Sequence, residues 1–381
     1  YQQLPKAHIG MVKNAYATGN TQLTKMADKV NQLSGTFQIL PDFLGSDQPR
    51  TYALMAMTTS EERSSGGLIG SVGVVTTDNG KIGIGDFRSN GEYIPYGAGD
   101  PTEDEQRIFR QWGPLNMSFD VRDLAVYPDT SRSAEGMRAI WQRTPWGSNT
   151  QLDGVLMVDP VFLQELTKIS GNVTIPDGTV LTGDNTAEFL LNKVYVDYPV
   201  SMQDALFAQV AEQAVGSMFS NIDLAKLTKV AQLMGSMAEG RHFSMYAFDE
   251  TAEKTISDAG FTAQTPSSEE HPQVGVYVTE QNPSKMGWYI HRTSKVTRST
   301  CGNDGSQTYH VEYKMTNTLE NSQIGALTSY ILGSGGQGVE KTLIYAPAGG
   351  SISNLKISGG SVTESRQETL NGKPCMRAMP R

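Results

Sequence analysis

The sequence predicts an α/β layered domain with a mixed sheet, followed by an all-β, sandwich-like domain. In residues 36–268, apolar strand patterns alternate with apolar stripes at helical spacing, which is typical of layered α/β folds. In residues 269–381 only strand patterns occur, separated by Gly, Asn and Pro. Thr265–Pro272 is rich in Pro, Ser and Glu, as a linker would be. Residues 1–35 are expected to form a helical lead-in.

The composition narrows the classes of protein. At roughly 100–200 residues per domain, 381 residues suggest two or three domains. A formal net charge of −9 argues against nucleic acid as a partner, because broad nucleic-acid binding needs a basic face. A charged fraction of 19% and 39 glycines are common in extracytoplasmic proteins. No apolar run approaches the roughly 18 residues that span a bilayer. We expect that a start Met and any targeting segment precede Tyr1.

The first elements are a helix and three strands. An apolar stripe at helical spacing predicts a helix that ends at Gly35. Its residues are Leu23, Met26, Ala27, Val30 and Leu33. Tyr52–Thr58 is apolar on both alternating faces, as a strand covered on both sides would be. Leu68–Thr76 and Lys81–Asp86 flank Asn79-Gly80, a strong hairpin signal because both turn positions need positive φ.

Residues 88–150 form a long irregular insert with one predicted helix, Ser133–Gln142. Its Tyr and Trp residues suit either a ligand-binding lid or a small core of its own. Next comes a predicted strand, Gly154–Val158, and a helix that Asp159 caps with Pro160 at its first position. The remaining predicted elements of this domain are helices at Ala187–Val196, Asp204–Phe219 and Glu250–Ala259 and a strand at His242–Phe248.

The second domain is predicted to consist of strands. They cover Val274–Thr279, Trp288–Thr297, Thr308–Thr316, Leu327–Leu332, Lys341–Tyr345, Ile352–Ile357 and the final segment. Gly333–Gly338 satisfies G-x-G-x-x-G, but a dinucleotide-binding fold needs a helix next. A strand pattern, Val339–Tyr345, follows instead, so the glycines are predicted to form a hairpin loop.

The histidines and cysteines do not form a metal-binding pattern. The five histidines are scattered, and two cysteines cannot supply a four-ligand zinc site with such neighbours. Cys301 and Cys375 either form a single disulfide in an oxidising compartment or stay unpaired. A serine hydrolase is disfavoured because the chain has no G-x-S-x-G.

Two charged segments at strand ends make up the candidate site. Thr58–Gly67 follows a buried strand, a usual position for ligand sites in α/β sheets, and includes Glu61, Glu62 and Arg63. Its Gly66 and Gly67 let a ligand or backbone approach closely. The second segment, Asp86–Asn90, ends the return strand of the hairpin. If the strands pair as predicted, both segments border one edge of the sheet.

The two arginines of these segments allow two interpretations. In the first, Arg63 and Arg88 are bidentate ligands of a phosphate or carboxylate. In the second, the charged residues form an internal Glu–Arg network that fixes the turn.

The order of several motifs resembles the domain-of-unknown-function family numbered 4012. Leu40–Arg50 and Glu61–Gly67 resemble the opening of the family, and Gly70–Ile82 the strand after it. Further similar segments are Tyr127–Ala134, Leu152–Pro160, Leu190–Tyr195, Gly240–Phe243, Val274–Tyr277, Lys285-Met286 and Tyr345–Gly349. The resemblance runs from about Leu40 almost to the end. It implies an envelope protein, mainly of actinobacteria, held by an N-terminal membrane segment; no activity is established for the family.

More distantly, the chain is similar to the LytR–CpsA–Psr phosphotransferases, which transfer glycopolymers from a polyprenyl-pyrophosphate donor to peptidoglycan. Arg63-Ser64 and Phe87–Asn90 stand where that family has its two Arg-containing turns, and Leu152–Ile175 is similar to its strand–helix stretch. The arginines carry over as Arg63 and Arg88. The Mg²⁺-binding carboxylates do not, since glycine and Asn90 replace them, and Ser201–Asp204 replaces the later arginine pair. These groups would neutralise a pyrophosphate during transfer.

Together, these features predict an extracytoplasmic cell-envelope protein of a Gram-positive bacterium, anchored by a membrane segment before Tyr1. We expect its α/β domain to bind an anionic ligand, a glycan or a polyprenyl phosphate. A cell-wall glycopolymer is the expected partner. The expected ligand-binding residues are Arg63, Gly66, Gly67, Arg88 and Asn90. One alternative is a divergent phosphotransferase that uses Glu61 or Asp86 as base or metal ligand, with Mg²⁺ as cofactor. Another is a non-catalytic structural or adhesive wall module.

Overall fold

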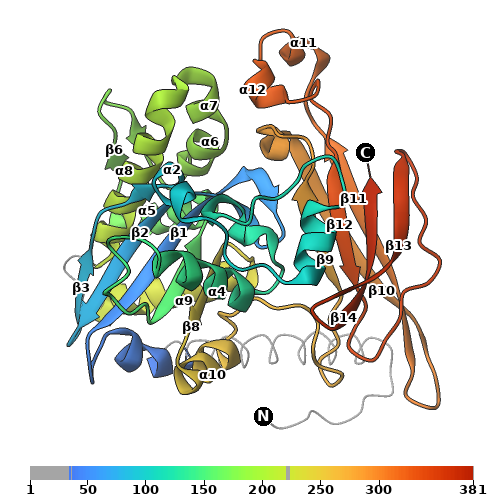
Figure 1. Cartoon of the computed structure of the whole chain (residues 1–381), viewed down its shortest axis with the longest axis horizontal. Helices are drawn as coiled ribbons and strands as arrows, with labels where there is room; N and C mark the ends of the chain where they lie inside the picture. Colours follow the sequence, from blue (N-terminus) through green and yellow to red (C-terminus); the bar gives the residue numbers. More distant parts are fainter. Residues whose placement is uncertain (1–33, 36, 220–223, 381) are drawn as a thin grey trace, which may run out of the picture.

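The computed structural model describes residues 34–35, 37–219 and 224–380. Figure 1 shows a mixed sheet with helices around it and a strand-rich part at the C-terminal end. This arrangement confirms an α/β part followed by a β-rich part. The predicted helix at residues 23–33 lies outside the described residues. Residues 34–35 and 37–43 are helical, so helical structure also occurs beyond Gly35, where the sequence predicted none.

The central sheet has the order β3-β2-β1-β5-β8, with β4 paired to β2. Its strands are β1 (Arg50–Arg63), β2 (Gly66–Asp78), β3 (Lys81–Ile84), β4 (Arg88–Ser89), β5 (Gly154–Val158) and β8 (Phe243–Ala247). β1 is antiparallel to β2 and parallel to β5, and β5 is antiparallel to β8. The sheet is therefore mixed, as predicted. Beside it, β6 (Val173–Thr174) and β7 (Val180–Leu181) form a separate pair.

β1 is much longer than its apolar pattern indicates. β1 continues through residues 59–63, beyond the predicted strand Tyr52–Thr58, and Arg63 pairs with Gly66 across the Ser64-Ser65 turn. A register shift lies between Thr58 and Glu62, where the strand leaves its regular pairing. The strand was predicted to end too early because charged side chains, which normally mark the surface, are here largely buried and paired. At the other end of β2, Asn79 (φ 46°) and Gly80 (φ 79°) form the predicted hairpin turn.

Most helices of the α/β part lie where periodicity predicts them. The α-helices are α2 (Asn90–Tyr93), α3 (Glu103–Glu105), α4 (Thr130–Trp141), α5 (Pro160–Ser170), α6 (Thr186–Glu188), α7 (Val194–Asp197), α8 (Val200–Phe219), α9 (Leu224–Glu239) and α10 (Glu250–Asp258). The 3₁₀ and π segments are η1 (Ile94–Tyr96), η2 (Gln106–Arg110), η3 (Val121–Val126) and η4 (Phe189–Lys193). α6, η4 and α7 follow one another as the single helix predicted at Ala187–Val196. α9 was not predicted, nor were the short elements α2, α3, η1, η2 and η3 of the insert.

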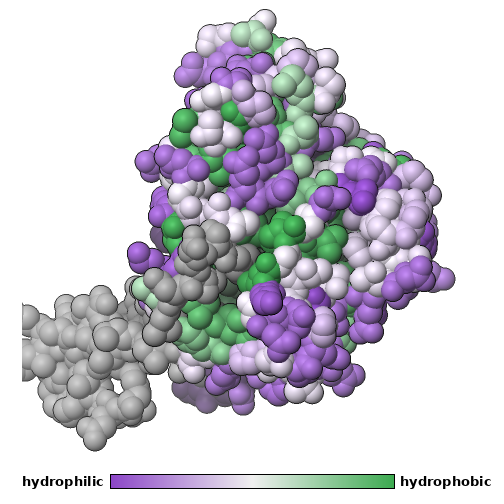
Figure 2. All heavy atoms as spheres, turned by 90° about the vertical axis from the view of Figure 1, so that its left-hand side faces the viewer, coloured by the Kyte–Doolittle hydropathy of each residue, from purple (hydrophilic) through white to green (hydrophobic). Residues whose placement is uncertain are grey.

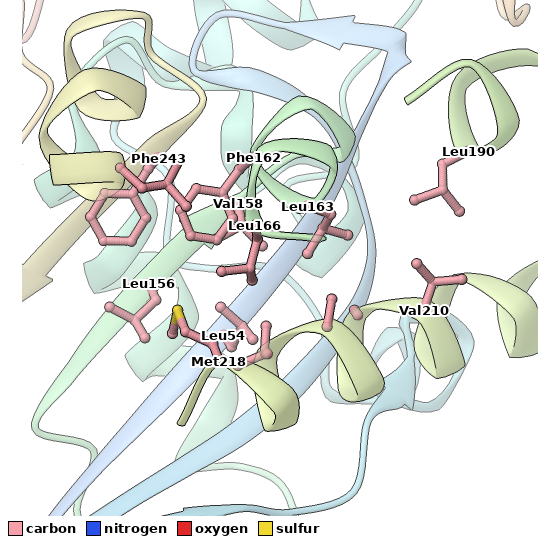
Figure 3. Close-up of a cluster of buried hydrophobic side chains, with 14 of the residues drawn as sticks. Leu54, Leu156, Val158, Phe162, Leu163, Leu166, Leu190, Val210, Met218 and Phe243 are labelled. Atoms are coloured by element: carbon pink, nitrogen blue, oxygen red, sulfur yellow. The ribbon is translucent and has the colours of Figure 1, made fainter. Parts of the chain in front are cut away.

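The two faces of β1 pack into different hydrophobic clusters. Tyr52 and Leu54 point into a cluster built largely with α5, α8 and α9, part of which Figure 3 shows. Ala53 and Met55 point into a second cluster with α4 and η3. This confirms the prediction of a strand covered on both sides. On the face seen in Figure 2, hydrophilic atoms dominate and hydrophobic ones gather near the middle.

The C-terminal part holds a four-stranded antiparallel sheet and a long hairpin. The sheet has the order β13-β14-β12-β9, with bounds β9 (Gly275–Glu280), β12 (Glu340–Tyr345), β13 (Val362–Leu370) and β14 (Lys373–Pro380). The hairpin is β10 (Ile290–Cys301) with β11 (Gln307–Asn317). Short helical segments are η5 (Met286–Tyr289), α11 (Asn321–Ile324) and α12 (Ser329–Leu332).

Two predicted strands of this part are wrong. Leu327–Leu332 ends in helix α12, because a short apolar run does not distinguish strand from buried helix. Ile352–Ile357 has no regular structure. The glycines of Gly333–Gly338 therefore connect a helix to β12 rather than two strands.

The hydrophobic clusters cross the predicted domain boundary at residue 268. Tyr277, Leu343 and Cys375 belong to the cluster that holds Ala53 and Met55. Met286, Tyr289 and Ile331 belong to the cluster of α5 and α8. Each large sheet lies on one side of residue 268, but the division into the domains 36–268 and 269–381 stays a prediction.

Asp159 is predicted to stabilise the start of α5 through two contacts. One carboxylate oxygen accepts hydrogen bonds from the amides of Val161 (2.9 Å) and Phe162 (3.0 Å). The other lies 2.6 Å from Nδ1 of His242, and this hydrogen bond raises the pKa of His242 above 6.5 despite its burial. Asp159→Ala should lower the free energy of unfolding by about 1–2 kcal/mol, as measured in urea.

The pH dependence distinguishes these two contacts. A His whose folded-state pKa is raised stabilises the fold below pH 6.5, and this contribution is lost as pH rises through the folded-state pKa. In the Asp159→Ala variant, the free energy of unfolding should therefore no longer show this decline above pH 6.5. Asp249→Ala is the matched control, since Asp249 caps α10 in the same way. An equal decline in native protein and Asp159→Ala would contradict the assignment.

Candidate functional site

A pocket of about 150 Å³ lies where β1 runs beyond its parallel neighbour β5. We call it the strand-end pocket. β5 ends opposite Ala56, and the following residues of β1 form one side of the pocket. Its apolar lining residues include Ala56, Met57, Leu68 and Phe207. Its polar lining residues include Thr58, Glu61, Asn90, Gln203, Asp204 and Lys285, together with Tyr195 and Tyr330. Ligands of α/β sheets commonly bind at such carboxyl ends of parallel strands.

Lys285 supplies the positive charge of the pocket. It precedes η5 in the β-rich part, and its ammonium group forms an ion pair with Glu61. Nζ lies 4.9 Å from the ring centre of Tyr195 and 4.7 Å from that of Tyr330. Both distances suit cation–π attraction. The side chain is only 9% exposed, so it is held at a defined place in the pocket wall.

The hydroxyl groups of the two tyrosines are also held by hydrogen bonds. The Tyr195 hydroxyl lies 2.9 Å from Oγ1 of Thr58, and the Tyr330 hydroxyl donates to Oε1 of Gln203 at 3.1 Å. Burial raises the pKa of Tyr195 well above its usual value, so this hydroxyl stays protonated. Burial also raises the pKa of Asp204, although Lys285 acts in the opposite direction. Asp204 therefore takes up a proton more readily than an ordinary aspartate does.

Behind the pocket, the end of β1 lies in a group of buried charges. Arg63 pairs with Asp123 at 3.0 Å, and Arg292 of β10 pairs with both Glu62 and Glu340. Burial raises the pKa of Glu62 well above its usual value, although the positive charge of Arg292 acts to lower this pKa. These pairs connect β1 with η3 and with the β-rich part.

Glu280 belongs to the same group of buried charges. It accepts a hydrogen bond from Ser284 Oγ and is 7% exposed. Burial raises its pKa to about 8, although the hydrogen bond from Ser284 acts in the opposite direction. Glu280 therefore stays largely protonated at neutral pH.

Arg63 is buried and ion-paired rather than open to a ligand. It is 5% exposed and bound to Asp123, so the internal network is the interpretation that its geometry supports, with aspartate rather than glutamate as partner. Burial alone would raise the pKa of Asp123, but Arg63 and Ser118 outweigh it and hold this pKa below its usual value. Gly67 serves close packing of the strands, because a Cβ there would lie 1.9 Å from the carbonyl oxygen of Thr58. Gly66 has a φ of 143° and faces the side chain of Met57.

Arg88 lies far from Arg63 along the sheet. Arg63 pairs with Gly66 of β2, whereas Arg88 pairs with Val72, six residues further along. At roughly 3.3 Å per residue, this places the two backbones about 20 Å apart. Arg88 is bound instead to Glu92 at 3.0 Å and stacks over Trp146 at 4.4 Å. A single small anion between the two arginines is therefore inconsistent with the strand pairing.

The structure brings together only two of the predicted site residues. Glu61 and Asn90 line the strand-end pocket, and Asn90 Nδ2 donates to the carbonyl of Ile69 at 3.0 Å. Asp86 is exposed and does not line this pocket. Sequence reasoning missed Lys285 and Asp204 because neither lies at a strand end of the sheet.

Three further observations concern predicted features. Cys301 is exposed and Cys375 is buried, and both are free thiols. Of the two alternatives that the sequence allowed, the structure therefore has unpaired cysteines and no disulfide between them. Among the described residues, no group of three or more His, Cys, Asp or Glu side chains is arranged to hold a metal ion. None of the described helices combines the length and apolar character needed to cross a membrane.

The two predicted arginines are expected to differ sharply in their effect on stability. Arg63→Gln leaves Asp123 buried without its cation, which should cost about 3–5 kcal/mol. Arg88→Gln removes a partly exposed pair and should cost less than about 1 kcal/mol. Chemical denaturation of both variants measures the difference. Similar costs would show that Arg63 is not held by a buried pair.

Glu280→Gln is expected to reduce the pH dependence of stability. Because the folded-state pKa is about 8 and the usual value is 4.5, native Glu280 favours the fold most below pH 4.5. This contribution falls as pH rises and is lost above about 8. Glu280→Gln should therefore match native stability near pH 4.5 and exceed it by a few kcal/mol, in order of magnitude, at pH 8. Urea unfolding at both pH values tests this, and a constant difference between the two proteins would contradict it.

Comparison with known proteins supports part of the predicted resemblance. Residues 47–195 match the model of a family described as "Protein of unknown function (DUF4012)". One similar solved structure is the transcriptional regulator yvhJ from Bacillus subtilis, with 13% identity, a TM-score of 0.27 and coverage of 70% of this chain and 90% of that chain. Another is the Lin1025 protein from Listeria innocua, with 9% identity, a TM-score of 0.27 and coverage of 69% and 91%. No curated protein matches the chain. The DUF4012 similarity predicted from sequence motifs is thus confirmed over residues 47–195.

Proposed function

We propose that this protein binds an amphiphilic ligand in the strand-end pocket, a phosphate group on an apolar chain such as a polyprenyl phosphate. The observation that carries the proposal is the division of the pocket into two chemical halves. Lys285 and Asn90 offer donors for a phosphate, and Met57, Leu68 and Phe207 offer an apolar wall. A pocket of this composition suits a charged head and the first carbons of a chain.

The charge balance sets a condition on anion binding. Glu61 already neutralises Lys285, so a phosphate must compete with Glu61 for the ammonium group. Asp204 adds a second acidic group, and its raised pKa allows it to take up a proton and to donate a hydrogen bond. Binding should therefore strengthen as the pH falls.

The pocket has room for only the head of such a ligand, and exposed apolar side chains follow or precede two of its lining residues in the sequence. About 150 Å³ equals the share of roughly five liquid waters, enough for a phosphate and a few carbons. Val196, Val200 and Met202, at the α7–α8 corner beside the lining residues Tyr195 and Gln203, are 47%, 62% and 46% exposed. An apolar chain that leaves the pocket would cover such side chains.

The cell-envelope location, the membrane anchor, the Gram-positive source and the LytR–CpsA–Psr-like fold remain parts of this proposal. They rest on the sequence resemblance described above. The phosphotransferase alternative has less support than ligand binding. It needs Glu61 or Asp86 as a base or metal ligand, but Glu61 is ion-paired and Asp86 lies outside the pocket.

Binding of farnesyl phosphate, a short soluble prenyl phosphate, tests the proposal by calorimetry on the full chain. Lys285→Gln should weaken binding about tenfold or more, because a charged hydrogen bond contributes about 1.5–3 kcal/mol. Asp204→Asn should tighten binding, since it removes a negative charge from the pocket. Because these two changes act in opposite directions, a general loss of folding cannot imitate the result.

The matched control is Lys295→Gln, which removes an exposed lysine of β10. It should bind like the native protein. Farnesol, which lacks the phosphate, should bind more weakly than farnesyl phosphate. Equal affinities of the native, Lys285→Gln and Asp204→Asn proteins for farnesyl phosphate would overturn the proposal.

A further inference from the structure

A second, larger cavity of about 670 Å³ lies at the opposite end of β1. We call it the amide-rich groove. It is formed by residues from the start of β1, from α4 and the loop after it, and from the end of β8. Its volume falls within the roughly 300–1,000 Å³ of ordinary small-molecule sites. None of the residues that line the strand-end pocket lines this groove.

The groove has a buried floor and a polar rim. Tyr52, Leu152 and Ala247, which are at most 6% exposed, contribute to the floor. The rim carries four amide side chains, Gln48, Gln142, Asn149 and Gln151, and the hydroxyls of Ser148 and Thr150. Each amide offers both a donor and an acceptor, which matches the hydroxyl groups of a sugar.

One arginine of the groove is ion-paired, and the other is stacked on an aromatic ring. Arg50 is 11% exposed and forms ion pairs with Asp42, with Asp47 (3.2 Å) and with Asp153 (3.9 Å). Arg138 stacks over the ring of Phe248 at 4.1 Å, which leaves its N–H donors at the edge of the plane. Because three carboxylates surround Arg50, an anionic ligand beside it would be repelled by them. A neutral ligand rich in hydroxyls would meet no such repulsion.

The loop that carries most of the rim is held in place before any ligand arrives. Trp141 Nε1 donates to the carbonyl of Thr150 at 2.9 Å, and the Gly147 amide donates to Oγ1 of Thr144 at 2.9 Å. Gly147 packs so closely that a Cβ would lie 2.3 Å from the carbonyl oxygen of Trp141. At the other end, the Asp153 amide donates to the carbonyl of Thr51 at 2.7 Å. A rim fixed in this way loses little conformational entropy on binding.

From these features we infer that the amide-rich groove is a binding site for a neutral oligosaccharide. The inference does not depend on the prenyl phosphate proposed for the strand-end pocket. It adds a second ligand site at the other end of the same strand.

The test is titration of the full chain with neutral tetrasaccharides, namely cellotetraose, maltotetraose, mannotetraose and chitotetraose, by ligand-observed NMR and calorimetry. At least one should bind at millimolar concentration or below. Gln142→Ala combined with Asn149→Ala should weaken this binding about tenfold, because two hydrogen bonds are lost. Both residues are exposed, so the fold should be retained.

Two comparisons locate the binding. Asn303→Ala combined with Gln367→Ala removes two exposed amides of the β-rich part and should leave oligosaccharide binding unchanged. Lys285→Gln should also leave it unchanged, whereas it weakens farnesyl phosphate binding if the strand-end proposal holds. The inference is wrong if no tetrasaccharide binds, if the Gln142 and Asn149 changes have no effect, or if Lys285→Gln abolishes oligosaccharide binding.

Discussion

The structure depends on one electrostatic constraint, the burial of charged side chains at the end of β1. Taking a charge out of water costs several kcal/mol unless a partner of opposite sign is close. Glu61, Glu62 and Arg63 are 18%, 18% and 5% exposed, and each has such a partner. Asp123 comes from η3, whereas Lys285 and Arg292 come from beyond residue 268. The requirement for these partners holds the β-rich part against the sheet and, with Lys285, supplies the cation of the strand-end pocket.

Local signals predicted the parts of the fold that are specified by neighbouring residues. Asn79-Gly80 specifies its hairpin by backbone conformation alone, and Asp159-Pro160 specifies the start of α5 by capping and a fixed φ. By contrast, Glu61–Arg63 were predicted to lie beyond the end of the strand, since nothing local reveals cations that are distant in sequence. The candidate site was therefore predicted only in part. Glu61 and Asn90 were found from their strand ends, while Lys285 is brought to the pocket by tertiary structure.

β1 connects the two candidate sites. Arg50 and Tyr52 at its start line the amide-rich groove, and Thr58 and Glu61 near its end line the strand-end pocket. The middle of the strand packs on both faces, so it is a stiff link between them. Both sites therefore keep a fixed separation.

The ion pair between Glu61 and Lys285 also has a consequence for biosynthesis. The two residues are separated by 224 positions in the chain. At roughly 5–20 residues per second, a ribosome needs between about ten and fifty seconds to make that interval. During this time β1 exists without the cations that compensate Glu61 and Glu62. The sheet therefore cannot complete its charge pairing while it emerges, and a nascent chain that ends before Lys285 and Arg292 would expose this strand end to chaperones and proteases.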